Sequence, residues 1–330
     1  MLGVPGVSTN SSNSGAGLSA DDVGARVSVR HHQRSGPVAS ATDVVGDLES
    51  LDADQLAIRR SDGSLVAIEA AAVIATRVVG PSLLSARELE EVSGRSWPAP
   101  DEEWLGRWWL RSAGGFTARA CSVRPLGNPG RPFDDALEYV VAWYAQRGLP
   151  AMIRAVSGSN VDAELDRRGW ESDRPAVFQT VTVARLRRSI AARSAASPTV
   201  RTASFPPQSW LRRYESGTIP PAALQALTGT PEAAFATIDA TDATAPAVAI
   251  GRAAVEGPWV GFTAIEVDPL ARRLGHARTV MSALTEWGAS RGAVRAWLEV
   301  LADNHSALSL YASLGFTEHH RYAYHSPPEV

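Results

Sequence analysis

The segment from Val260 to Ser290 combines a strand, a short loop rich in arginine, and a long helix. Gly261–Val267 is predicted as a strand that Asp268-Pro269 ends, and the run Arg272-Arg-Leu-Gly-His-Ala-Arg278 opens a helix that extends to Ser290. Backbone N–H groups and the helix dipole converge at such a helix start, and a glycine there allows close approach. Because arginine suits phosphate oxygens, the loop predicts an anion site for a phosphorylated ligand.

This loop differs from two common phosphate-binding patterns. No Gly-Lys-Ser/Thr follows it, and the three-glycine spacing of a dinucleotide fingerprint is missing. Instead, Arg272-x-x-Gly275-x-Ala277 resembles motif A of the GCN5-related N-acetyltransferases (GNAT), Arg/Gln-x-x-Gly-x-Gly/Ala. Further on, Asn304-x-x-Ala-x-x-Leu-Tyr311-x-x-Leu-Gly-Phe316 resembles motif B of the same family.

The resemblance covers residues 205–330 and implies acetyl-CoA as the acyl donor. The backbone of Ile265, Glu266 and Val267 would hydrogen-bond the pantetheine arm, and Asn304 would help to position the donor. The loop would hold the pyrophosphate through Arg272, Arg273, Leu274, Gly275, His276, Ala277 and Arg278.

The resemblance also implies catalytic roles. Tyr311 would protonate the leaving CoA thiolate. An ammonium must lose its proton before it attacks a thioester, so a base is expected. Glu299 matches the base position of the ribosomal-protein N-terminal acetyltransferases, and Glu266 is the other candidate. Plainer interpretations stay open: Tyr311 as a packed aromatic, Glu299 as a solvated carboxylate, and Asn304 as a helix cap.

An earlier part of the chain resembles this segment. Trp143-Tyr-Ala-Gln-Arg-Gly148 matches Trp287-Gly-Ala-Ser-Arg-Gly292 at Trp, Ala, Arg and Gly. An asparagine follows the final glycine of each segment by 12 residues, at Asn160 and Asn304. We interpret this as a diverged tandem repeat of one α/β domain. The first copy is expected to contain a strand at 115–123 and helices at 133–147 and 161–168.

The first copy departs from both GNAT motifs. It has Gly127-Asn-Pro-Gly-Arg131 where motif A should stand, and Leu165 in place of the tyrosine of motif B. We therefore expect it neither to bind CoA in the family manner nor to supply the acid. It would instead support the catalytic copy and form one wall of the acceptor site.

The N-terminal part predicts a small barrel. Five short β-like runs lie between Val23 and Val79, and Asp62-Gly63 is a hairpin-turn signal between two of them. The layout resembles an actinobacterial GNAT subfamily with an N-terminal SH3-like barrel and a degenerate first repeat. The predicted α/β organisation is a disordered tail (1–22), the barrel (23–80), the degenerate GNAT-like repeat (81–184), a linker (185–208) and the catalytic GNAT domain (209–330).

Composition limits the remaining possibilities. The single cysteine, Cys121, excludes a disulfide within the chain and a Cys-based zinc site. The histidines lack ligand spacing, so we expect no metal. No apolar run is long enough to span a membrane, and no signal peptide is recognised, which predicts a cytoplasmic protein. With a net charge of −3 overall and six basic against seven acidic residues in 23–79, a nucleic-acid partner is disfavoured.

These observations favour an acetyl-CoA-dependent N-acetyltransferase that transfers acetyl directly to a primary amine of a protein, a peptide or a small molecule. The alternative is a non-catalytic acyl-CoA-binding module whose barrel recruits a protein partner. A nucleic-acid- or ribosome-associated factor is a third hypothesis, and it would require a basic barrel face.

Overall fold

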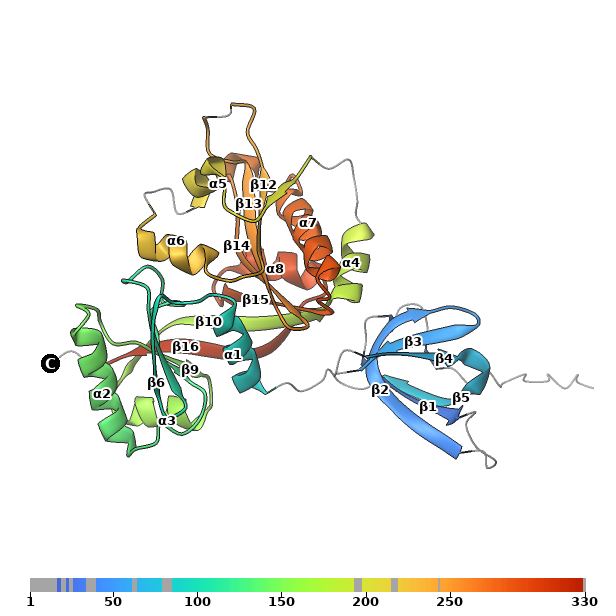
Figure 1. The fold of residues 1–330 in the computed structure, drawn as a ribbon, viewed down its shortest axis with the longest axis horizontal. Coiled ribbons are helices and arrows are strands. Elements are labelled where there is room, and N and C mark those ends of the chain that lie inside the picture. Colours follow the sequence, from blue (N-terminus) through green and yellow to red (C-terminus); the bar gives the residue numbers. More distant parts are fainter. Residues whose placement is uncertain are drawn as a thin grey trace, which may run out of the picture. The chain divides into compact units, whose positions relative to one another are not determined.

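The computed structural model describes residues 17–18, 22–23, 26–33, 40–60, 64–78, 85–192, 198–214, 219–242 and 244–328 (Figure 1). Two compact units, Met1–Leu83 and Leu84–Val330, contain these residues. Most of the predicted tail and the Asp62-Gly63 turn lie outside the described residues. Within the described ranges, no helix has the length and apolar character that a membrane crossing requires.

The N-terminal unit is a five-stranded antiparallel sheet, which confirms the five predicted strands. Val27, Val29 and Leu48 are buried in its core. A Cβ added to Gly46 would lie 2.2 Å from the carbonyl oxygen of Arg59, so glycine is required where these strands approach closely. In the spatial order β4-β3-β2-β1-β5, the strands are β1 (Arg26–Gln33), β2 (Ser40–Leu51), β3 (Gln55–Arg59), β4 (Leu65–Glu69) and β5 (Val73–Val78).

The first repeat begins with a helix whose first residues are fixed by Ser85 and Glu88. The Ser85 hydroxyl accepts a hydrogen bond from the Glu88 N–H, and the Glu88 carboxylate accepts one from the Ser85 N–H (2.8 Å), which is a capping box. The predicted helices at 133–147 and 161–168 are confirmed as α2 and α3. The elements are α1 (Ala86–Arg95), β6 (Asp101–Leu105), β7 (Trp108–Ser112), β8 (Arg124–Pro125), α2 (Phe133–Ala145), β9 (Ile153–Val156), α3 (Asn160–Arg167) and β10 (Glu171–Thr182).

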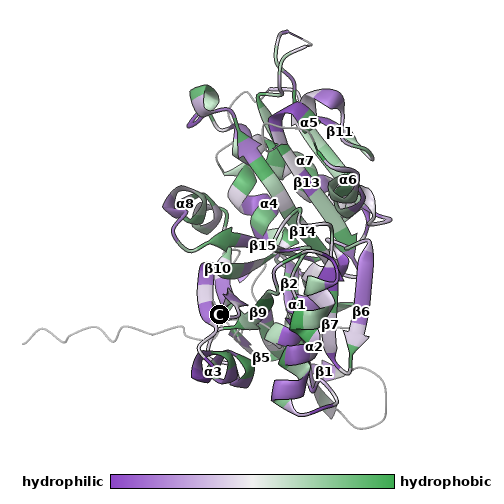
Figure 2. Cartoon of the chain, turned by 90° about the vertical axis from the view of Figure 1, so that its left-hand side faces the viewer, coloured by the Kyte–Doolittle hydropathy of each residue, from purple (hydrophilic) through white to green (hydrophobic). Residues whose placement is uncertain are grey.

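The second repeat follows a connecting helix, α4 (Val183–Ala191). Its order β14-α7-β15-α8-β16 reproduces β8-α2-β9-α3-β10 of the first repeat. Val280, Met281 and Leu284 of α7 are fully buried in the main core, and the helices carry hydrophobic and hydrophilic faces (Figure 2). The elements are β11 (Arg201–Ala203), α5 (Gln208–Arg213), α6 (Pro221–Thr228), β12 (Ala233–Ile238), β13 (Ala249–Glu256), β14 (Trp259–Val267), α7 (His276–Ser290), β15 (Arg295–Leu301), α8 (His305–Ser313) and β16 (Thr317–Ser326).

The two repeats exchange their last strands. One eight-stranded sheet has the order β11-β12-β13-β14-β15-β10-β16-β9. Strand β10 ends the first repeat but pairs with β15 of the second, and β16 ends the second repeat but pairs with β9 of the first. The two exchanged strands also pair with each other. Each repeat therefore needs a strand of the other to complete its sheet. Figure 1 shows the two exchanged strands, β10 and β16, side by side in unit 2.

A column of stacked rings crosses the exchanged strands. Phe178 of β10 stacks on Trp297 of β15, with ring centroids 5.4 Å apart, and on His320 of β16, with centroids 4.7 Å apart. Trp297 also lies against Gly261 of β14, where an added Cβ would approach the indole ring to 2.2 Å. The column thus packs three strands of the shared sheet together.

Two expectations for local structure are wrong. Residues 115–123 form turns instead of a strand, since Gly114 and Gly115 have φ values of +60° and +82° and break the extended run. The stretch 185–208, expected to be a linker, contains most of α4 and all of β11. Val183 and Leu186 of α4 are buried, so an apolar stripe holds this arginine-rich helix to the core.

We predict that Phe178→Ala lowers the free energy of unfolding by about 3 to 5 kcal/mol, because it removes the middle ring of the column. Hydrogen exchange followed by mass spectrometry should show protection falling in both β9 and β15, although they belong to different repeats. Val44→Ala, in the core of the N-terminal unit, is the control and should leave both strands protected. A loss confined to the second repeat would contradict the coupling of the repeats.

Candidate active site

The two central strands of the second repeat separate where the predicted donor site lies. Strands β14 and β15 pair in parallel from Trp259–Arg295 to Phe262–Leu298, and no further pair joins them within the described residues. Figure 1 shows β15 running away from β14 at a wide angle. We call the region where Thr263–Val267 and Glu299–Leu301 part the β14/β15 divergence.

A bulge marks the start of the divergence on β14. Ala264 has a φ of +52°, and the register against β13 shifts between Ile250 and Arg252. After the bulge, Glu266 and Val267 pair with β13 on one edge. Their other edge faces the divergence, and the backbone of an extended strand is the kind of surface that hydrogen-bonds an extended ligand. The predicted contact residues Ile265, Glu266 and Val267 therefore lie together on this edge.

The arginine-rich loop lies directly after β14. Asp268 caps the short turn Pro269–Ala271 by accepting from the Leu270 N–H (2.9 Å). Arg273 has a φ of +65°, and Gly275, with a φ of +86°, is the N-cap of the 15-residue helix α7. Long helices concentrate partial positive charge and unsatisfied N–H groups at this end. A helix start of this kind suits an anion, and the anion site at this loop stays a prediction.

The basic residues of this loop divide into two groups. Arg272 and Arg273 are exposed, as is Leu274, whereas His276 and Ala277 are half-buried in the first turn of α7. Arg278 is tied down: its Nη1 donates to the Ser189 carbonyl of α4 (3.2 Å), and its Nη2 donates to the Ser313 hydroxyl of α8 (2.8 Å). Arg278 thus holds three helices together around the loop.

Helix α8 places Asn304 and Tyr311. Asn304 is its N-cap, and the side-chain oxygen accepts from the Ala307 N–H (3.1 Å) and the Ser306 hydroxyl (3.0 Å). Tyr311 is buried, with its ring edge-on to Phe316 at 5.9 Å. Burial raises the pKa of Tyr311 to about 12, although the positive charge of Arg119 acts in the opposite direction. The phenol is therefore protonated at neutral pH and can donate a proton.

Glu299 is a buried carboxylate clamped by side chains of the first repeat. Arg154 donates from Nη2 to Oε1 (2.7 Å) and from Nη1 to Oε2 (3.0 Å). Oε2 also accepts from Arg119 Nε (3.0 Å) and from the Tyr322 hydroxyl (3.1 Å). Burial alone would raise the pKa of Glu299, but the charges of Arg154 and Arg119 hold it well below its usual range. It is not the solvated carboxylate of the plainer interpretation.

The clamp continues into the first repeat. Glu90 of α1 accepts from Arg154 Nη2 at Oε1 and from Arg124 Nη1 at Oε2, both at 2.6 Å, and His320 Nε2 lies 3.0 Å from Oε1. Burial opposes ionisation of Glu90, but Arg154 and Arg124 lower its pKa to about 2. Alternating charges thus run from Arg124 through Glu90, Arg154 and Glu299 to Arg119. We call these five residues the charge chain.

Four of these residues escaped the sequence analysis. Their partners are 34 to 180 positions away, so no local spacing connects them. The sequence holds one signal: Arg154 interrupts the otherwise apolar run Ala151–Val156. A charge inside such a run has to be paired.

The first repeat has a cavity at the equivalent position. It measures about 410 Å³ and lies between β8 and β9, which are joined in parallel only by the Val123–Ile153 bridge. No residue of the Asn128–Arg131 loop lines it, so it lacks the arginine-rich anion loop of the second repeat. Its lining residues are Ser85, Ala86, Arg87, Glu90, Arg124, Pro125, Leu126, Gly127, Arg154, Ala155, Val156, Ser159, Asn160 and Val161.

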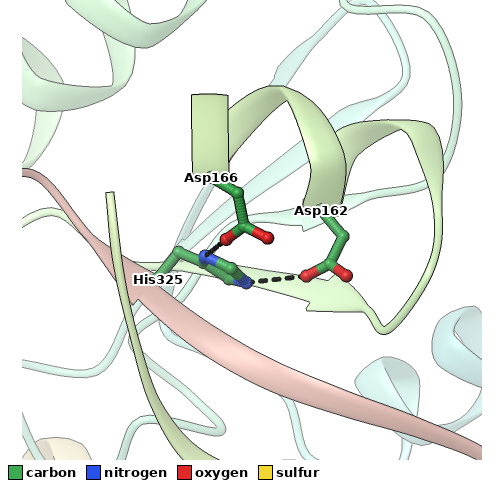
Figure 3. Close-up of side chains that lie close together, drawn as sticks. All are labelled: Asp162, Asp166 and His325. Carbon is green, nitrogen blue, oxygen red and sulfur yellow. Dashed lines mark hydrogen bonds and ion pairs between the residues drawn. The ribbon is translucent and has the colours of Figure 1, made fainter. Parts of the chain in front are cut away.

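One group of side chains has the chemistry of metal ligands. Asp162 and Asp166 of α3 face His325 of β16 (Figure 3), with Asp162 Oδ1 3.0 Å from Nε2 and Asp166 Oδ1 3.9 Å from Nδ1. The two carboxylates address different nitrogens of one imidazole, which suits a held histidine better than convergence on one ion. The group links α3 of the first repeat to the exchanged strand.

Comparisons with known proteins decide the family. A family model described as "Probable histone acetyltransferase Rv0428c C-terminal" matches residues 85–325, and one described as "Rv0428c N-terminal Sm-like domain" matches residues 21–77. The chain belongs to the Rv0428c-like family of GNAT N-acetyltransferases. Membership makes it an acyltransferase, and it confirms the predicted order of a small N-terminal barrel followed by GNAT-like repeats.

Individual relatives agree with this assignment. "Probable histone acetyltransferase Rv0428c" of Mycobacterium tuberculosis is 30% identical over 312 residues, which cover 92% of this chain and 94% of the relative. The solved "GCN5-related N-acetyltransferase from Kribbella flavida" has a TM-score of 0.55 at 16% identity, covering 74% of this chain and 96% of its own. A "Tandem GNAT protein from the clavulanic acid biosynthesis pathway" has a TM-score of 0.50 at 15% identity, covering 77% and 91%. These two structures share the fold.

We predict that Glu90→Gln makes this GNAT protein less stable at neutral pH and less sensitive to acid. The pKa of Glu90 is about 2 in the fold against an ordinary value of 4.5. The stability it contributes is therefore complete above pH 4.5 and is lost as the pH falls toward 2. Urea unfolding at a series of pH values between 3 and 7 measures this. The free energy of unfolding should change less with pH in the variant than in the wild type. Glu138→Gln, on an exposed site of α2, is the control, and an equal change with pH in wild type and Glu90→Gln would contradict the prediction.

Proposed function

We propose that the second repeat transfers acetyl from acetyl-CoA directly to a primary amine. The observation that supports the proposal is the β14/β15 divergence, with the arginine-rich loop directly after β14 and with Tyr311 of α8 in the core cluster against which Ile265 and Val267 pack. Extended backbone on one strand suits the amide-rich pantetheine arm, and the exposed loop at the start of α7 suits the pyrophosphate. Asn304 supports the site by capping the helix that carries Tyr311.

In the proposed reaction the amine nitrogen attacks the thioester carbonyl carbon, and the C–S bond breaks. Backbone N–H groups of β14 around Val267 polarise the carbonyl and stabilise the developing oxyanion. Tyr311 gives its proton to the thiolate and regains one from solvent, and the nitrogen that formed the new C–N bond releases its extra proton to solvent. The acetamide keeps the acetyl group, so acetyl-CoA and amine become CoA thiol and acetylated amine.

The contacts of Glu299 argue against its use as the base. A carboxylate that accepts four hydrogen bonds, three of them from guanidinium groups, binds a further proton weakly. We propose instead that Glu299 positions Arg154 and Arg119, and that the ammonium loses its proton to solvent or to the half-buried Glu266 on the other side of the divergence. The acceptor is a protein, a peptide or a small amine; the name of the M. tuberculosis relative refers to histones.

Gly275→Glu should abolish micromolar binding of acetyl-CoA by placing a negative charge where the pyrophosphate is proposed to lie. Calorimetry should give at least about a tenfold loss, or ~1.4 kcal/mol. The φ of +86° strains any side chain, but no atom lies within 4 Å of an added Cβ. Gly275→Ala is therefore the matched control, with the same strain and no charge. Equal affinities for the two variants would argue against the site, and a wild type that binds no acyl-CoA would end the proposal.

Tyr311→Phe tests whether the site is catalytic. It keeps the ring packed against Phe316 and removes only the proton donor, so kcat should fall about 100-fold or more while the Kd for acetyl-CoA stays unchanged. Release of CoA thiol with a panel of amines measures the rate. Unaltered kcat would assign Tyr311 to packing alone. Acetyl-CoA binding without turnover by the wild type would favour the acyl-CoA-binding module.

A further inference from the structure

The first repeat sends a loop to the divergence of the second. Residues Thr117–Cys121 form a turn. The backbone carbonyl of Arg119 in this turn accepts a hydrogen bond from Nη1 of the buried Arg111 (2.9 Å), which fixes the turn to the core of the first repeat. The side chain of Arg119 then reaches Glu299 on β15. An arginine of the first repeat thus stands beside the central strand that faces the proposed donor site.

Arg119 also lies against an aromatic ring that Arg252 of β13 contacts as well. Its guanidinium carbon lies 5.2 Å from the centroid of the buried Trp97 ring, and that of Arg252 lies 4.9 Å from the same ring. Arg252 donates to the hydroxyl of Thr263 (3.4 Å), the residue before the Ala264 bulge. The surroundings of Arg119 therefore extend, through Trp97 and Arg252, to Thr263 at the start of the divergence.

Arg119 has unused hydrogen-bond donors. Its hydrogen-bond partner is Glu299, reached through Nε, and within the described part of the chain neither Nη group has a hydrogen-bond acceptor. Its side chain is 25% exposed, whereas those of Glu299 and Arg154 are 1% and 0% exposed. The Nη edge is the planar, two-pronged face of a guanidinium that binds carboxylates in bidentate fashion.

The surroundings favour an anion. Arg252 is buried and bonds only to the Leu227 carbonyl and to the hydroxyls of Thr230 and Thr263 among the described residues, without a carboxylate. Burial and the nearby charge of Arg119 lower the pKa of Arg252 to about 9. The two guanidiniums therefore repel each other, and an anion between them would be favoured. Four nearby guanidiniums are paired: Arg119, Arg124 and Arg154 with Glu90 or Glu299, and Arg111 with Glu102 at 3.7 Å. Arg252 adds a fifth positive charge to this region.

We propose that the Nη edge of Arg119 is a carboxylate-binding subsite for the acceptor, so that this enzyme prefers amines that carry a carboxylate. The inference rests on the proposed function, because the charge of Arg119 also reaches Tyr311, the proposed proton donor. A carboxylate held at Arg119 places its own amine beside the thioester. A strongly basic peptide meets repulsion at the same point.

Matched acceptors test the subsite in the full chain. Peptides that begin Ala-Asp or Ala-Asn share one N-terminal amine, and 4-aminobutyrate and its amide form a small-molecule pair. We expect the acidic member to have at least about a tenfold higher kcat/KM, expressed mainly in KM, as the loss of a charge-assisted hydrogen bond implies. Preference within the peptide pair alone or the small pair alone distinguishes the two sources of the carboxylate.

Arg119→Gln should abolish the preference and leave the acidic and neutral members equal. The fold should survive, since Glu299 keeps both hydrogen bonds from Arg154 and the one from Tyr322. Arg119→Lys keeps the positive charge but lacks the two-pronged donor face of a guanidinium, so it should retain part of the preference for the acidic member. Arg131→Gln removes the same charge from a loop where the side chain lies over Tyr139, and it should retain the wild-type ratio. An equal ratio in wild type and Arg119→Gln would overturn the proposal.

A binding measurement separates this inference from the proposed function. N-acetylated Ala-Asp and Ala-Asn peptides resemble products and need no turnover, and their affinities can be compared by calorimetry. Tighter binding of the acidic product, lost in Arg119→Gln, supports the subsite even if no amine of the panel is acetylated. Equal binding of the two products to the wild type overturns the subsite, and turnover of the neutral amines would then leave the proposed function intact.

Discussion

The ion pair between Arg154 and Glu299 is the contact on which unit 2 depends. Each partner is buried in a different repeat, and neither charge has enough water around it to be stable alone. Glu90 and Arg119 extend the pair on either side, so the charge chain passes from α1 of the first repeat to the divergence of the second. Removal of Arg154 would take a guanidinium from both buried carboxylates, Glu90 and Glu299. The first repeat therefore supplies part of the electrostatic environment of the second.

This arrangement alters what a carboxylate on the central strand can do. A glutamate beside a thioester site would be a proton acceptor if it were partly solvated, but here the guanidiniums keep the pKa of Glu299 far too low. The same guanidiniums bring positive charge to the place where acyl transfer is proposed. An ammonium is disfavoured in that field, and a neutral amine or an anionic group is favoured. In the proposed reaction the positive charges would thus favour the neutral form of the amine, and no strong base on β15 would be needed.

The sequence predicted the parts of the fold that local chemistry determines. The start of α7 at Gly275, the cap at Asn304 and the five strands of the barrel all follow from nearby residues, and the structure agrees. The exchange of β10 and β16 could not be predicted, because both strands follow a helix in the same repeat unit and either pairing satisfies their pattern. The charge chain was missed for the same reason: Arg119 and Glu299 are 180 residues apart, and only the exchanged fold brings them together.

The exchange has a consequence for how the chain is made. A ribosome releases the first repeat long before residues 295–326, yet β10 pairs with β15 and β16, and β9 pairs with β16. During synthesis the first half must wait with an unsatisfied sheet edge and with Arg154 lacking Glu299. Such edges attract other chains, so this interval is the period of greatest exposure to aggregation and to chaperones. The last ten-residue strand completes both halves at once.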